Sequence, residues 1–104
     1  MKESDVQRSI LEYLQIKRIF HYRNNSGAFV FPETANTKRR FFKAGVVGSP
    51  DIICVINGQF VGIEVKKPGG KQNDNQIQFQ KDLEKAGGKY VLAYSLDDVI
   101  KEGK

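Results

Sequence analysis

Residues 51–66 read DIICVINGQFVGIEVK, and this stretch decides the fold of the chain. Two runs rich in β-branched residues, 51–56 and 59–66, flank Asn57-Gly58, the dipeptide that two-residue type I′ turns favour. The stretch therefore predicts a β-hairpin. Because a two-residue turn fixes the register, Asp51 faces Glu64 directly across the two strands. We expect their Cβ atoms to lie about 4.5–5.5 Å apart.

The same register places a cation beside the two acids. Side chains alternate along a strand, so Lys66 projects from the same face of the hairpin as Glu64. Both faces are mostly apolar, which predicts a central hairpin covered on both sides. Two carboxyl groups at the edge of such a sheet repel each other and lose hydration. Either Mg²⁺, which prefers oxygen ligands, offsets these costs, or the three side chains form a structural ion cluster.

The flanking sequence predicts helices and further strands. Residues 4–7 have the pattern of a capping box that opens a helix running to about residue 17. Residues 21–24, 28–31 and 89–95 are predicted strands, and residues 75–86 and 96–101 are predicted helices. Residues 32–50 show no clear periodicity and are predicted to form a long loop. The order predicts one α/β domain over residues 1–104, with a small mixed sheet flanked by helices.

Composition narrows the class of protein. A chain of 104 residues, of which 39% are hydrophobic, supports one compact domain. Seventeen Lys and Arg against twelve Asp and Glu give a formal charge of +5, which favours nucleic acid as a partner over a membrane. No apolar run approaches the roughly 18 residues of a membrane helix. The single Cys54 excludes an internal disulfide and a cysteine-based zinc site, so we expect a cytoplasmic protein.

Two other polar side chains are candidates to join the acid pair. By helical spacing, Glu3 lies about 35° from the centre of the apolar stripe of the first helix and points toward the core. The alternative is a first-turn acid that complements the helix dipole. Gln76, in the first turn of the second helix, either reaches back over the hairpin end or lies in solvent.

Two basic stretches flank the acid pair. The first lies in the predicted loop, where Phe41 and Phe42 interrupt four cations, and the second follows the hairpin. Such cations would neutralise phosphates. The two aromatic residues either stack on unpaired bases or anchor the loop to the core. The predicted DNA-binding residues are Lys38, Arg39, Arg40, Lys43, Lys67 and Lys71.

The order of these motifs resembles a known nuclease superfamily. Pro50-Asp51, twelve further residues and then Glu64-Val65-Lys66 resemble the PD-(D/E)xK signature. The wider pattern is similar to the VRR-NUC domain (virus-type replication-repair nuclease) in its stand-alone phage and bacterial form. The matching stretches are RNNSG at 23–27, GSPDII at 48–53, FVGIEVKKP at 60–68, QIQF at 76–79 and AGG at 86–88. The family's usual Ser-Pro before the glutamine is replaced here by NDN at 73–75.

This resemblance implies a fold, an activity and roles for named residues. It implies a restriction-endonuclease-like core and a structure-specific DNA endonuclease in a bacterial or phage-infected cell, with Holliday-junction resolvases and DNA-repair enzymes among the similar proteins. It also implies a homodimer. Asp51, Glu64 and the Val65 carbonyl would bind Mg²⁺ or Mn²⁺.

The remaining site residues follow from the same resemblance. Lys66 would orient or deprotonate the attacking water, Glu3 would be the family's helix-1 acid, and Gln76 its glutamine. The alternatives are a nucleic-acid-binding module that kept the fold without catalysis, and an ion-pair-stabilised scaffold for a protein partner.

Overall fold

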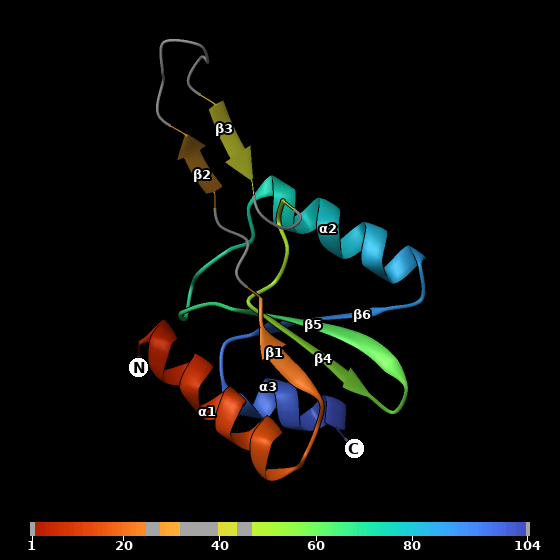
Figure 1. The fold of residues 1–104 in the computed structure, drawn as a ribbon. Coiled ribbons are helices and arrows are strands. Elements are labelled where there is room, and N and C mark those ends of the chain that lie inside the picture. Colours follow the sequence, from red (N-terminus) through yellow and green to blue (C-terminus); the bar gives the residue numbers. More distant parts are fainter. Residues whose placement is uncertain (1, 25–27, 32–39, 44–46, 104) are drawn as a thin grey trace.

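The computed structural model describes residues 2–24, 28–31, 40–43 and 47–103, and for 28–31, 40–43 and 103 it describes the backbone alone. Strands β1, β4, β5 and β6 form a four-stranded mixed sheet in the order β1-β4-β5-β6, and β2 and β3 form a separate two-stranded ribbon (Figure 1). The predicted α/β architecture with a central hairpin is confirmed. The elements in chain order are α1 (Glu3–Ile16), β1 (His21–Arg23), β2 (Ala28–Phe31), β3 (Arg40–Lys43), β4 (Ile52–Ile56), β5 (Gln59–Val65), α2 (Asp74–Lys85), β6 (Lys89–Ala93), α3 (Leu96–Ile100) and the 3₁₀ helix η1 (Lys101–Gly103).

The helices cover the two faces of the sheet unequally. Helices α1 and α3 lie on one side of the sheet and α2 lies on the other (Figure 1). The first side holds the main core, in which Ile10, Leu14 and Ile63 are fully buried. On the other side α2 packs near β6, while Val55 and Phe60 remain 40% and 41% exposed. The prediction that both faces are covered is therefore wrong at the hairpin tip, because a hollow, and not packed side chains, lies between the tip and the C-terminal end of α2.

The hairpin has the predicted register. Strand β4 pairs antiparallel with β5 from Ile52–Ile63 to Ile56–Gln59. Asn57 and Gly58 both have positive φ, 53° and 77°, as a type I′ turn requires. Strand β1 adds to β4 antiparallel and β6 adds to β5 in parallel. A parallel neighbour needs a crossover connection, which α2 supplies.

Several predicted boundaries are wrong. Helix α1 begins at Glu3, before the predicted capping residue Ser4, because the backbone N–H of Lys2 donates to the Asp5 carboxylate at 3.4 Å. Strand β3 lies inside the predicted loop, since its aromatic residues form a strand once β2 is available to pair with it. The last strand and α3 end at Ala93 and Ile100, slightly before the predicted limits. Within the described ranges, no helix is long and apolar enough to cross a membrane.

The turn before β4 fits closely against the first turn of α2. Gly48 has φ +80°, and a Cβ atom added there would lie 2.2 Å from the carbonyl oxygen of Asn75. In β5, a Cβ atom added to Gly62 would lie 2.6 Å from Cγ of Pro50. Only glycine leaves room for these two approaches. They bring the start of β4, the middle of β5 and the start of α2 together.

Replacing Gly48 should test this packing, with Gly69 as the matched control. Gly69 has a similar φ of +84° but nothing within 4 Å of an added Cβ. Gly69→Ala should therefore cost only about 1–2 kcal/mol of unfolding free energy for the left-handed conformation. Gly48→Ala adds a backbone clash and should cost about 3 kcal/mol or more. Urea unfolding followed by circular dichroism measures both, and equal losses would contradict the described contact.

Candidate active site

The site lies where β1, β4 and β5 carry polar residues across one row of the sheet. The backbone N–H of Asn24 donates to the Asp51 carbonyl at 2.7 Å, which extends the β1–β4 pairing by one residue. The hairpin register, extended in the same way, sets Asp51 opposite Glu64. One carboxylate oxygen of Asp51, Oδ2, accepts the backbone N–H of Val65 at 2.9 Å. The structure thus brings Asp51 and Glu64 together as predicted, and holds Asp51 in place through the backbone of β5.

Glu64 is the only charged or polar residue in the buried core of the described chain, with 4% of its surface exposed. Its Oε2 accepts a hydrogen bond from Nε2 of Gln76 at 3.1 Å and lies 3.7 Å from Nζ of Lys66. Its Oε1 is buried and has no hydrogen-bond partner among the described residues. A buried carboxylate oxygen without a partner is costly, so this atom marks a place where a ligand would stabilise the protein.

The surroundings of Glu64 raise its pKa from 4.5 to about 7. Burial is the largest cause, because it removes water from the charged form, and the neighbouring charge of Asp51 is the second. The ammonium of Lys66 lowers the Glu64 pKa, whereas a hydrogen bond that the protonated Glu64 carboxyl group forms with the Asp51 side chain, and then the charge of Glu3, add smaller increases. A carboxyl group with such a pKa in a polar cluster is typical of functional sites.

Gln76 reaches Glu64 because a capping box positions the start of α2. The side chain of Asn73 accepts the backbone N–H of Gln76 at 2.9 Å, and Oε1 of Gln76 accepts the backbone N–H of Asn73 at 3.0 Å. This pair leaves Nε2 of Gln76 free to donate to Glu64. The NDN sequence at 73–75 therefore begins α2 at a position from which Gln76 reaches Glu64. Of the two alternatives for Gln76, the structure shows the one that reaches over the hairpin end.

The other predicted site residues are placed as follows. Glu3 is exposed in the first turn of α1. In the part of the chain that the structure describes, no three or more His, Cys, Asp or Glu side chains group to hold a metal ion, so Glu3 does not join the acid pair there. Lys67 and Lys71 are exposed in the loop after β5. Lys38 and Arg39 lie outside the described residues, and Arg40 and Lys43 are described only as backbone of β3.

A hollow of about 460 Å³ beside Asp51 contains residues to which the sequence analysis gave no role. It is lined by Gln7, Arg23, Asn24 and Asp51. Nδ2 of Asn24 donates to the Pro50 carbonyl at 3.0 Å and to the Ser49 hydroxyl, and so holds the turn that leads into Asp51. Arg23 supplies an exposed cation next to the acid pair. These residues meet only through the pairing of β1 with β4, a three-residue contact that leaves no local signal in the sequence.

Tyr90 is a second residue without a predicted role. It is 7% exposed and lies on β6 in register with Gly62, on the same face of the sheet as Glu64. Burial, with smaller contributions from the charges of Glu64 and Asp51, raises the pKa of its hydroxyl to about 12. The ring also contacts Phe79 of α2, with centroids 6.5 Å apart. Only the parallel pairing of β6 with β5 brings Tyr90 to this face.

The residues present fit a divalent cation held between the two acids. Glu64 offers the unpartnered Oε1, and Asp51 has a second oxygen besides the one that accepts the Val65 N–H. These are hard oxygen donors of the kind that Mg²⁺ and Mn²⁺ take. A cation would also oppose the repulsion between two carboxylates that share one row of the sheet.

Comparison of the chain with protein-family models and with curated proteins finds no match. A function can therefore be inferred only from the chemistry of the site and from the sequence motif that builds it.

The raised pKa of Glu64 predicts how stability depends on pH when no metal is bound. Between about pH 4.5 and 7 the folded chain keeps the Glu64 proton that the unfolded chain has lost. The free energy of unfolding should therefore fall as pH rises through this window, by about 1–3 kcal/mol from this group. Urea unfolding with a chelator, at about pH 5 and pH 8, measures the change.

Glu64→Gln should remove this component of the pH dependence and make the metal-free protein more stable at the higher pH. Glu12→Gln, which changes an exposed glutamate on α1, is the matched control and should leave the pH dependence as it is. If wild type and Glu64→Gln show the same pH dependence, the pKa of Glu64 is not raised in the folded protein.

Proposed function

We propose that the chain is a metal-dependent DNA endonuclease that hydrolyses phosphodiester bonds, built on a restriction-endonuclease-like core of the VRR-NUC type. The observation that carries this proposal is the buried, unpartnered Oε1 of Glu64 beside Asp51 and Lys66. A purely structural ion cluster would pair its buried oxygens within the protein. An oxygen without a hydrogen-bond partner is available to coordinate a cation.

The side chains around the ion have distinct roles in this proposal. Asp51 and Glu64 would hold Mg²⁺ or Mn²⁺, with the Val65 carbonyl as the third protein ligand that the resemblance implies. When bound, the ion supplies Lewis acidity at the scissile phosphate. Gln76 fixes Oε2 of Glu64 by its hydrogen bond and so keeps Oε1 directed to the ion.

Lys66 lies where it can act on the nucleophile. Its side chain is 17% exposed, so the ammonium borders both the buried acid and the solvent. It can hold a water next to the phosphate and stabilise the negative charge that develops as the water attacks phosphorus. Hydrolysis adds the hydroxyl of that water to phosphorus and leaves a proton for the departing oxygen. Tyr90 and Arg23 border this space, and Arg23 provides a further cation for the phosphate.

The basic surface supports DNA as the substrate. The chain carries a formal charge of +5, and no salt bridge within the described ranges involves Lys67 or Lys71. Both lie in the loop that follows β5, the strand that carries Glu64. We propose that they contact phosphates next to the cleaved bond. For Lys38, Arg39, Arg40 and Lys43 the same role is proposed from the sequence alone.

The test is cleavage by the purified protein in Mg²⁺ or Mn²⁺, against duplex, flap, splayed and four-way-junction DNA. Asp51→Asn, Glu64→Gln and Lys66→Met should each lower the cleavage rate at least about 100-fold, because each removes a charge at the reacting phosphate. A chelator should abolish cleavage by wild type. The rate should also rise through neutral pH, since a proton on Glu64 competes with the ion.

Lys67→Ala and Lys71→Ala are the controls for this experiment. They should weaken DNA binding and reduce its salt dependence, yet cleave at a normal rate when DNA is saturating. Wild type that binds DNA but cuts none of the four substrates in either metal would point to the non-catalytic binding module instead. Near-normal cleavage by any of the three site variants would refute the assignment.

A homodimer remains part of the proposal. Each chain carries one acid pair and can cut one strand, whereas a four-way junction offers two equivalent strands related by a two-fold axis. Sedimentation equilibrium at micromolar concentration should give twice the chain mass of 11.8 kDa. A monomer that still makes paired cuts on a junction would contradict this arrangement.

A further inference from the structure

Exposed apolar residues continue the active-site face of the sheet toward the hairpin tip. Val55 pairs directly with Phe60, and its backbone N–H donates to the Phe20 carbonyl at 3.1 Å, so these three residues form one row across the sheet. They are 69% (Phe20), 40% (Val55) and 41% (Phe60) exposed. Tyr22, two residues along β1, is 49% exposed and meets Phe20 edge to face with ring centroids 6.4 Å apart. We call these four residues the aromatic platform.

The platform and the acid pair belong to the same face. Residues two apart on a strand point to the same side, and Asp51 lies four residues before Val55, as Glu64 lies four after Phe60. At about 3.3 Å per residue, the row of Phe20 lies about 13 Å from the row of Asp51. Ile53 and Tyr90, in the row between them, are buried. The platform is thus the uncovered part of the surface that carries the site.

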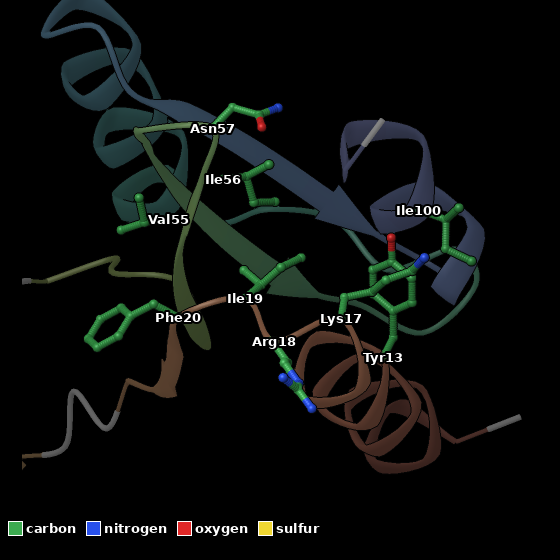
Figure 2. Close-up of a pocket in the computed structure, with 9 residues that line it drawn as sticks. All are labelled: Tyr13, Lys17, Arg18, Ile19, Phe20, Val55, Ile56, Asn57 and Ile100. Atoms are coloured by element: carbon green, nitrogen blue, oxygen red, sulfur yellow. The ribbon is translucent and has the colours of Figure 1, made fainter.

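One exposed cation, Arg18, lies two residues before Phe20 at the outer end of the platform. A hollow of about 560 Å³ is lined by Phe20 and Val55 together with Lys17 and Arg18, and it contains no acidic residue. Figure 2 shows the side chains of Phe20 and Val55 directed away from Tyr13 and Ile100, whereas Lys17 extends toward Tyr13 and Ile100. Arg18 projects from the end of α1. Neither Lys17 nor Arg18 takes part in a salt bridge within the described ranges. Rings and unpaired cations together complement a strand that offers bases and phosphates.

Arg18 occupies a position that glycine would suit better. It follows α1 with φ 56°, in the left-handed region that costs other residues about 1–2 kcal/mol. Its backbone N–H donates to the Gln15 carbonyl at 3.0 Å, so the backbone alone ends the helix. The cap therefore does not depend on a hydrogen bond from the guanidinium.

We propose that the aromatic platform binds unpaired bases of a single-stranded DNA segment beside the cleaved bond, with Arg18 holding a phosphate of that segment. This inference rests on the proposed nuclease function and names the substrate class: DNA with a single-stranded arm. Bases inside a duplex already stack on each other, so only unpaired bases gain from Phe20, Tyr22 and Phe60.

The test compares binding of a short oligothymidylate and of a blunt duplex, by fluorescence anisotropy, in the Asp51→Asn background so that no DNA is cut. Phe20→Ala and Phe60→Ala should each weaken oligothymidylate binding about 5- to 50-fold and duplex binding less than about 2-fold. Ile16→Ala removes an equally exposed apolar side chain outside the hollow and should change neither. Arg18→Gly should raise folding stability yet weaken binding of the single strand, whereas Lys85→Ala on α2 should weaken it less.

A direct signal comes from Phe20→Trp, since the chain has no tryptophan of its own. Its emission should be quenched by oligothymidylate and not by blunt duplex. Equal losses on both DNAs, or no loss for either ring variant, would overturn the platform. So would a dimer that Phe20→Ala dissociates without a selective loss of single-strand binding. Failure of every variant to bind any DNA would instead refute the proposed function itself.

Discussion

The two-residue turn at Asn57 and Gly58 is the constraint from which the rest of the site follows. With both residues at positive φ, the turn permits one register of β4 on β5. A slip of one residue would move the buried set of Ile52, Cys54 and Ile56 to the opposite face and separate Asp51 from Glu64. The fully buried apolar residues therefore protect the register, and the register in turn keeps two acids side by side. Core packing and site chemistry are specified by the same sixteen residues.

Holding Glu64 in this position costs the metal-free protein stability. The group is buried, lies beside a second carboxyl group and has one oxygen without a partner among the described residues. The ammonium of Lys66 and the amide of Gln76 partly offset this cost, and both contact Oε2 of Glu64. The protein thus stabilises one oxygen of Glu64 and leaves the other without a hydrogen-bond partner among the described residues. The same burial and the neighbouring charge of Asp51 raise the pKa of Glu64.

The sequence correctly predicted the features that depend on contacts between residues close together in the chain. The hairpin, its register and the approach of Asp51 to Glu64 all follow from a turn and from alternation, and the structure agrees with each. The missed features depend on contacts between distant segments. Strand β3 is a strand only because β2 pairs with it, and Arg23 joins the hollow beside Asp51 only through the pairing of β1 with β4. Periodicity within one segment carries no information about such partners.

The two helices that border the site show the same limit. The helix-1 acid, Glu3, has the right angular position for a core-facing residue but sits in the first turn, where α1 projects into solvent. Gln76 has a solvated sequence context, yet the capping box turns its side chain toward Glu64. In both cases the position of the side chain depends on where the helix begins relative to the sheet. A shift of one residue at the start of a helix turns each side chain by about 100° and so decides whether it reaches the site.

The parallel pairing of β5 with β6 determines when the surroundings of Glu64 can form as the chain is synthesised. The strand that carries Glu64 is an inner strand only once β6, from the C-terminal part of the chain, has paired with it. A nascent chain that has emerged only as far as α2 has β5 as an open edge, with Glu64 less buried and Tyr90 absent from the site. The buried surroundings of Glu64 are therefore complete only after the residues of β6 have been synthesised.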